Sequence, residues 1–202
     1  MNKLTMLALT GLLTFCASAA LAQNRPQTTP IAGVVASVTD AEVDVMKADG
    51  TVAAIKLSDK TRYTYVSSLK IEDIQPNSYV GVGAMTGTDG TNTAMEVTVF
   101  PETARGIGEG FGPWNQGANS TMTNGTVAQV VSTNGHTLTV TYKGGQQEIV
   151  VPDGTPVTTF ALTDKSALAA GAQILVRATK ADDGSFNAVF ISIGKDGYVP
   201  KG

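Results

Sequence analysis

Apolar and polar residues alternate in short runs along the chain from residue 31 onward, and turn residues separate the runs. Alternation with a period of two is typical of β-strands that bury one face. The first half has six such runs, at residues 31–38, 42–47, 52–57, 62–66, 79–85 and 93–100. The second half has six more, at residues 126–132, 137–142, 147–151, 157–160, 174–179 and 187–193. The pattern therefore predicts an all-β fold.

The two sets of runs belong to an internal repeat. Residues 57–101 align with residues 151–195 without a gap, and the Asp89-Gly90 turn matches the Asp183-Gly184 turn. A slip of one residue turns a whole strand inside out, so chance does not preserve the apolar phase over this length. We infer two homologous modules.

Each module has the strand order of a known small barrel. In each module, three strands and a short β segment (62–66 and 157–160) precede a short helix (69–74 and 165–169) and two further strands. Three strands, a helix and two strands are the order of a five-stranded Greek-key barrel of the OB type. The sequence predicts an all-β protein of two tandem small five-stranded OB-like barrels, at 31–100 and 124–197. Two sandwich-like sheets or an open meander are the alternatives. The segments outside the barrels are a disordered N-terminus at 23–30 and a C-terminal tail at 198–202.

The N-terminus has the three parts of a secretory signal peptide. Lys3 makes the start positive, residues 4–16 are mostly apolar, and small residues precede a cut predicted after Ala22. An uncleaved membrane anchor is the alternative, since the apolar stretch is nearly long enough to span a bilayer. Cleavage after residue 22 predicts a periplasmic protein that is not inserted in the membrane.

Composition narrows the chemistry. Without the signal peptide the chain has 13 basic and 17 acidic side chains, so we expect no nucleic-acid partner. The only Cys lies in the signal peptide, and the only His, His136, is expected at an exposed hairpin tip. Hydrolytic triads and zinc or copper sites draw on these residue types. We therefore predict no catalytic residue, no metal site and no cofactor.

The segment at 101–123 has no counterpart in the repeat. Four glycines surround Glu109, with Arg105 before them and Trp114, the only Trp, after them. Glycines allow close backbone approach, and Arg and Trp are common anchors of binding surfaces. The candidate binding residues are Glu102, Arg105, Glu109 and Trp114.

A structural clamp is the favoured interpretation of the same segment. In that interpretation Phe111 and Trp114 pack into the groove between the barrels, while Arg105 pairs with Glu102 or Glu109. A plain linker is the third interpretation. The glycine run is not a phosphate loop, because no Lys-Ser/Thr pair follows it.

The segment also carries a resemblance to a known family. The residues that carry it are Val99-Phe-Pro-Glu102, Arg105-Gly106, Gly108-Glu-Gly110, Pro113-Trp114 and 120–125. They resemble secreted proteobacterial proteins with tandem domains of the family called domain of unknown function 5666. The resemblance covers nearly all of the mature chain and implies secretion and a tandem small-domain fold, but no activity. One departure is Asn115, where the family pattern has an acidic residue.

These observations favour a non-enzymatic periplasmic binding or interaction protein. Its partner is expected to be an envelope protein or a small ligand. The alternative is a carrier of a small ligand or a metal ion in the cell envelope, and an enzyme ranks third. The orientation of the modules and the oligomeric state stay open.

Overall fold

The computed structural model describes residues 27–131 and 136–201. The predicted signal peptide, residues 1–22, and residues 132–135 lie outside these ranges. The described part is all-β, as predicted, with 13 strands in one hydrogen-bonded sheet and three short 3-10 turns. Within the described ranges, no helix has the length and apolar character needed to cross a membrane.

The first repeat and the connecting segment supply the elements up to β7. They are β1 (Thr29–Val38), β2 (Glu42–Met46), β3 (Val52–Lys56), β4 (Arg62–Leu69), η1 (Ile71–Asp73), β5 (Tyr79–Thr86), β6 (Asn92–Val99), η2 (Glu102–Ala104) and β7 (Gly110–Pro113). The second repeat supplies the rest. They are β8 (Ser120–Val131), β9 (His136–Tyr142), β10 (Gly145–Val151), β11 (Val157–Thr163), η3 (Lys165–Ala167), β12 (Gln173–Lys180) and β13 (Phe186–Gly194).

Nine of the twelve predicted strands agree with the observed bounds to within two residues at each end. The exceptions are β4 and β11, which run three residues further than predicted, and β8, which begins six residues earlier. The two predicted helices are only three-residue 3-10 turns, η1 and η3. The predicted disordered N-terminus is too long, because Thr29 and Pro30 already belong to β1.

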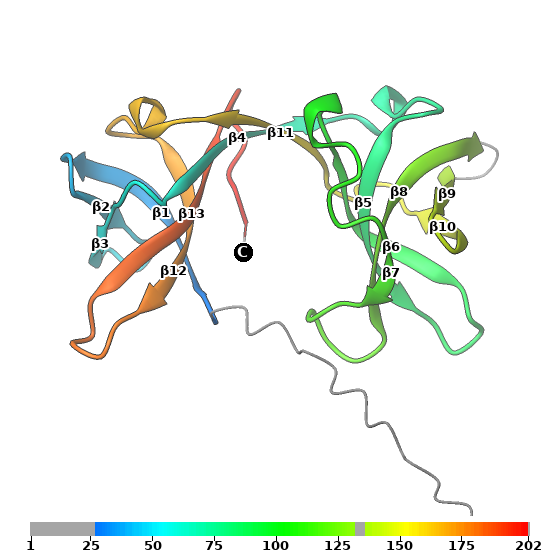
Figure 1. Ribbon diagram of the computed structural model, residues 1–202, viewed down its shortest axis with the longest axis horizontal. Helices are drawn as coiled ribbons and strands as arrows, with labels where there is room; N and C mark the ends of the chain where they lie inside the picture. Colours follow the sequence, from blue (N-terminus) through cyan, green and yellow to red (C-terminus); the bar gives the residue numbers. More distant parts are fainter. Residues whose placement is uncertain (1–26, 132–135, 202) are drawn as a thin grey trace, which may run out of the picture.

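The strands form two closed rings of five. In the first ring β1 pairs with β2 and β12, β2 with β3, and β12 with β13, and a parallel pairing of β13 with β3 closes the ring. We call it lobe I. In lobe II, β8 pairs with β9 and β5, β9 with β10, and β5 with β6, and β10 closes on β6. Figure 1 shows lobe I on the left and lobe II on the right.

Neither lobe is built from one repeat. Lobe I joins the first three strands of the first repeat to the last hairpin of the second, and lobe II joins the converse parts. The expectation that residues 31–100 and 124–197 each close a barrel of their own is therefore wrong. Such an exchange is possible because both repeats present the same apolar pattern, so each hairpin fits either set of three strands.

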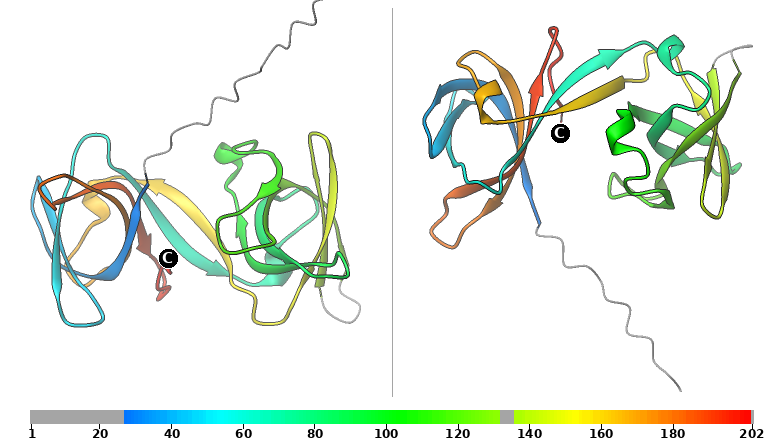
Figure 2. Two further views of the ribbon diagram at one scale, coloured as in Figure 1. Left: turned by 90° about the horizontal axis from the view of Figure 1, so that it is seen from below. Right: turned by 45° about the horizontal axis from the view of Figure 1, so that its top comes forward.

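Two crossing strands carry the chain from one lobe to the other. β4 leaves lobe I and β11 leaves lobe II, and they pair antiparallel over seven residue pairs, from Val157–Leu69 to Thr163–Tyr63. Each also pairs in parallel with a hairpin strand, β4 with β13 and β11 with β6. This two-stranded bridge joins the lobes at the top of Figure 1, and Figure 2 shows it from two further directions.

The two hydrophobic cores follow the exchange. The core of lobe I packs Val43 and Val45 from the first repeat against Ile191 from the second, all fully buried. The core of lobe II packs Val82 from the first repeat against Leu138 from the second. Complete burial of such a side chain stabilises the fold by roughly 1.5–3 kcal/mol. Each lobe therefore depends on both repeats.

Candidate functional site: the groove between the lobes

Arg105 and Glu102 come together in the structure. The Arg105 guanidinium donates from Nε and Nη2 to the two carboxylate oxygens of Glu102, a bidentate pair. Nη2 also donates to the Asn77 carbonyl oxygen at 2.8 Å, and Nη1 to Thr126 Oγ1 at 3.3 Å. The guanidinium carbon lies 5.8 Å from the centre of the Tyr79 ring, a cation–π distance.

These contacts make Arg105 a clamp within lobe II. Its hydrogen bond to Glu102 holds the pKa of that carboxyl below its ordinary value and raises the pKa of the guanidinium. Most of the donors of Arg105 are used by the protein itself, so few remain for a ligand. Of the two partners that the clamp interpretation offered, the structure selects Glu102.

Glu109 and Phe111 also make contacts within lobe II. The Glu109 carboxylate accepts a hydrogen bond of 2.9 Å from the backbone N–H of Lys143, and the Phe111 ring stacks on Tyr142 with centroids 6.3 Å apart. β7, which follows Glu109 and contains Phe111, pairs with β8. The segment thus forms a cover on lobe II, and Phe111 does not pack between the lobes.

Trp114 lies apart from the other three candidates. Its ring sits against Gly83 of β5, where an added Cβ would lie 2.5 Å from Trp114 Cζ3, so only glycine leaves room for the indole. The backbone N–H of Trp114 donates to the Ser120 carbonyl oxygen at 2.8 Å. The half-buried indole lines a space between the two lobes, unlike the other candidates.

That space is a continuous groove beneath the bridge, made of two adjoining cavities of about 970 and 610 Å³. Both cavities are lined by Val66, Thr98, Thr158, Phe190 and Ser192. These residues come from β4, β6, β11 and β13, so the groove exists only because the lobes are joined in this way. We call it the interlobe groove.

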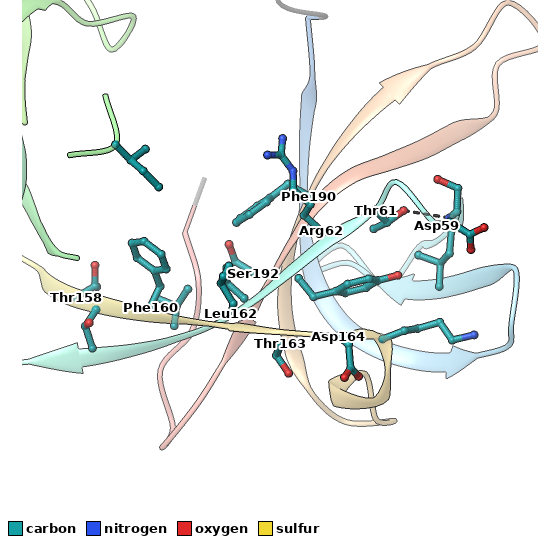
Figure 3. Close-up of a pocket in the computed structure, with 18 of the residues that line it drawn as sticks. Asp59, Thr61, Arg62, Thr158, Phe160, Leu162, Thr163, Asp164, Phe190 and Ser192 are labelled. Carbon is teal, nitrogen blue, oxygen red and sulfur yellow. Dashed lines mark hydrogen bonds between the residues drawn. The ribbon is translucent and has the colours of Figure 1, made fainter. Parts of the chain in front are cut away.

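The larger cavity forms the apolar end of the groove. Figure 3 shows Phe160 of β11 and Phe190 of β13 bordering this space. Leu162 and Ile107 also line it and are 74% and 60% exposed. Large apolar side chains left open to solvent in a concavity are typical of binding sites.

A buried hydroxyl lines the same cavity. Thr64 is 2% exposed, and its Oγ1 has no hydrogen-bond partner in the described part of the chain. At the far rim, Lys165 Nζ donates to Asp40 Oδ1 at 2.7 Å. This exposed ion pair lowers the pKa of Asp40, chiefly through the hydrogen bond.

The smaller cavity forms the polar end, where charges of opposite sign come from opposite lobes. Glu96 of lobe II and Arg177 of lobe I both line it, together with Trp114 and Tyr198. The walls of the groove raise the pKa of the Glu96 carboxyl by burial, although its side chain still reaches solvent, and Arg177 opposes the shift. Burial, and then the charge of Glu96, raise the pKa of the Tyr198 hydroxyl.

Sequence reasoning missed Glu96, Arg177 and Phe190. All three lie on the outward side of a strand, where the sequence alone does not distinguish a site residue from ordinary solvent-exposed surface. One signal was present: Glu96 aligns with Phe190, so the repeats differ there, whereas the neighbouring Val97 and Ile191 agree. Inward positions of the repeats match, whereas the pair of Glu96 and Phe190 shows that an outward position that reaches the groove can differ.

The remaining sequence expectations concern His136 and metals. His136 begins β9 with a side chain only 19% exposed, and its Nε2 lies 4.0 Å from Glu72 Oε1, so it is not the exposed tip residue predicted. Among residues 27–131 and 136–201, no three His, Cys, Asp or Glu side chains gather as a metal would require.

Comparison with known proteins brought no relative. No protein-family model, curated protein or solved structure matches the chain.

Proposed function

We propose that this chain is a non-enzymatic binding protein of the periplasm whose ligand or partner occupies the interlobe groove. The observation that carries the proposal is the groove itself: a continuous concavity that both lobes and the bridge line together. Its cavities fall within the roughly 300–1,000 Å³ of typical ligand sites, and apolar walls with a few polar groups are the usual composition of such sites.

The internal repeat supports this location. Val80, Val82 and Val97 in the core of lobe II align with Ile174, Val176 and Ile191 in lobe I. In contrast, Gly83 aligns with Arg177, and Glu96 with Phe190. Both residues of each differing pair lie on the hairpins that face the groove. A groove between identical faces would be symmetric, and these differences give it a polar and an apolar end.

The proposed periplasmic location rests on residues 1–22, whose pattern is that of a cleaved export signal. We also propose that each lobe is an OB-like barrel assembled from two repeats. A three-stranded meander completed by a hairpin, with one parallel closing pair, supports that assignment. Membership of the domain-of-unknown-function family remains part of the proposal and stands on the sequence resemblance alone.

The test is to fill the groove and ask what is lost. Ser192→Trp places a large ring between the cavities, whereas Met46→Trp adds the same ring at an exposed site on β2 outside them. Native mass spectrometry of the protein released from the periplasm, with cross-linking in intact cells, should show a bound molecule or partner. We expect it on the wild type and Met46→Trp, and not on Ser192→Trp.

Two results would contradict the proposal. One is capture by Ser192→Trp at the wild-type level, which would place the site elsewhere. The other is a wild-type protein that carries no ligand and cross-links to no partner. Circular dichroism of both variants checks that the added ring leaves the β fold in place.

A further inference from the structure

The interlobe groove has the chemistry of an amphiphile's binding site. Its larger cavity has a mainly apolar lining that includes Phe160, Leu162 and Phe190, although charged side chains such as Arg62 and Asp164 also border it. The smaller cavity that continues from it has a mainly polar and ionic lining. A ligand that fills both must be apolar along one part and charged at the other. A free sugar or a small ion does not match the apolar end, and a plain hydrocarbon does not match the polar one.

The polar end carries both signs of charge. Arg177 and Lys201 are cations, and Glu96 is the carboxylate among them. No ion pair joins Glu96 and Arg177 in the part of the chain that the structure describes, although the two charges are close enough for Arg177 to act on the pKa of Glu96. The groove thus holds two opposite charges across an open space, each with hydrogen-bonding capacity left.

Trp114 adds a third element to this end. An aromatic face beside a carboxylate is the arrangement that binds alkylated ammonium groups, through cation–π attraction and charge together. Arginine and lysine are in turn the residues that bind phosphate. A head group that joins a phosphate to an ammonium group satisfies Arg177, Lys201 and Glu96 at once.

We propose that the ligand is a single-chain amphiphile with a zwitterionic phosphate–ammonium head, a lysophospholipid. This inference rests on the proposed function. The acyl chain lies in the apolar end, against Phe160, Leu162 and Phe190. The phosphate meets Arg177 and Lys201, and the ammonium group meets Glu96 and the face of Trp114.

Charge complementarity selects this head group over simpler ones. A fatty acid supplies an anion for Arg177 and Lys201 but no cation for Glu96 and the face of Trp114, and an alkylammonium ion leaves both cations without a partner. The acyl chain supplies most of the binding free energy through burial of its methylene groups. Free phosphocholine, which has the head alone, is therefore expected to bind poorly.

The mature full chain carries its own reporter, because Trp114 is its only tryptophan. The experiment titrates the protein with palmitoyl lysophosphatidylcholine below its micellar concentration and follows the indole emission. Sodium palmitate, hexadecyltrimethylammonium and free phosphocholine are titrated in parallel. We expect a saturable change with the lysophospholipid and binding at least about tenfold weaker with the other three.

Substitutions at the two ends are tested with matched controls. Arg177→Met is compared with Lys180→Met on the same strand, Glu96→Gln with Glu148→Gln, and Leu162→Ser with Val52→Ser, all controls exposed and outside both cavities. Each groove variant should raise Kd for the lysophospholipid roughly tenfold or more, as loss of a charged hydrogen bond or of apolar contact predicts. The controls should leave Kd unchanged.

The outcomes distinguish this inference from the proposed function on which it rests. Palmitate binding as tightly as the lysophospholipid, or a Glu96→Gln protein with unchanged Kd, overturns the zwitterionic head. No saturable response to the lysophospholipid overturns the amphiphile. If Ser192→Trp nevertheless abolishes capture of another ligand, such as a peptide or a glycan, the proposed function stands without this inference. If no groove-dependent ligand exists, both fail.

Discussion

Lobe I and lobe II have cores of the same apolar pattern but differ in what covers them. In lobe II, the segment at 101–123 lies on the outer face of the hairpin, with Trp114 over Gly83. In lobe I, the equivalent position carries Arg177, and the C-terminal tail folds back on the hairpin, where Tyr198 and Pro200 lie against Gly194 of β13. The repeated residues thus build interchangeable frames, whereas the unrepeated ones give each frame its own surface.

The largest expected effect comes from a charge in one core. Val176→Asp buries an unpaired carboxylate in lobe I and should lower the free energy of unfolding by more than about 4 kcal/mol. Hydrogen exchange should then show lost protection in β1, β2 and β3, which lie far away in sequence. Val82→Asp, at the aligned position, should instead expose β8, β9 and β10. Lost protection in β8–β10 of the Val176→Asp protein would contradict the strand exchange.

A cut in the chain distinguishes the exchanged connectivity from two independent tandem barrels, and it changes no core residue. Residues 115–119 form an exposed loop between β7 and β8, and a protease site inserted there allows a single cut after folding. Since each lobe holds strands from both fragments, the cut halves should elute together in size-exclusion chromatography without denaturant. Independent tandem barrels would separate into two smaller species.

A pair of glycines tests how alike the two frames are. Gly33 of β1 and Gly125 of β8 both lie where an added Cβ would collide with a carbonyl oxygen of the neighbouring strand, from Met46 and Thr141. Each change to Ala should cost about 1–3 kcal/mol, as overpacking does, and the two costs should be similar. Gly112→Ala, which meets no neighbouring atom within 4 Å, is the control for chemical denaturation curves. Unequal costs would show that the frames differ in rigidity.

The cover of lobe II should depend on Arg105. Arg105→Ala removes the pair with Glu102 and the hydrogen bond to Asn77, so the Tm should fall by a few degrees while binding in the groove persists. Lys180→Ala, on exposed surface, should leave the Tm unchanged. Lost ligand capture at an unchanged Tm would return Arg105 to the role of a recognition residue.

The smallest effect is a pH dependence confined to lobe II. Arg105 holds the pKa of Glu102 below its unfolded value of 4.5, so the pair stabilises the fold above that pH. The stabilisation is lost as the pH falls from the unfolded pKa through the lowered folded pKa, because the native carboxylate must then take up a proton. Thermal melts of wild type and Glu102→Gln should differ slightly at neutral pH and converge in acid. A difference that grows in acid would contradict this sign.

Local pattern predicted most strands, and the exceptions have one cause. None of Ser67, Ser68 and Leu69 is one of the β-branched or aromatic residues that are typical of strands, so the prediction ended β4 at residue 66. In the structure these residues pair with Val157, Thr158 and Thr159 of β11. Pairing with a distant strand overrides weak local propensity, and a single sequence does not show that partner.

The candidate site divides in the same way. Trp114 was identified from composition alone, because a single Trp in a glycine-rich segment is conspicuous. The role of Arg105 depended on whether Glu102, Asn77 and Thr126 lay within its reach, which only the folded chain shows. Glu96 and Arg177 are distant in sequence and come together because the exchange brings the two hairpins face to face.

By itself, the sequence determined the all-β class, the positions of the turns and the inward face of each strand, because a period of two and the turn residues act locally. Only the tertiary structure decided which hairpin completes which lobe. The repeats carry the same apolar pattern, so either connectivity buries nearly the same side chains. The pairing of β4 with β11 distinguishes the two connectivities, because it holds the crossing strands together and leaves the groove beneath them.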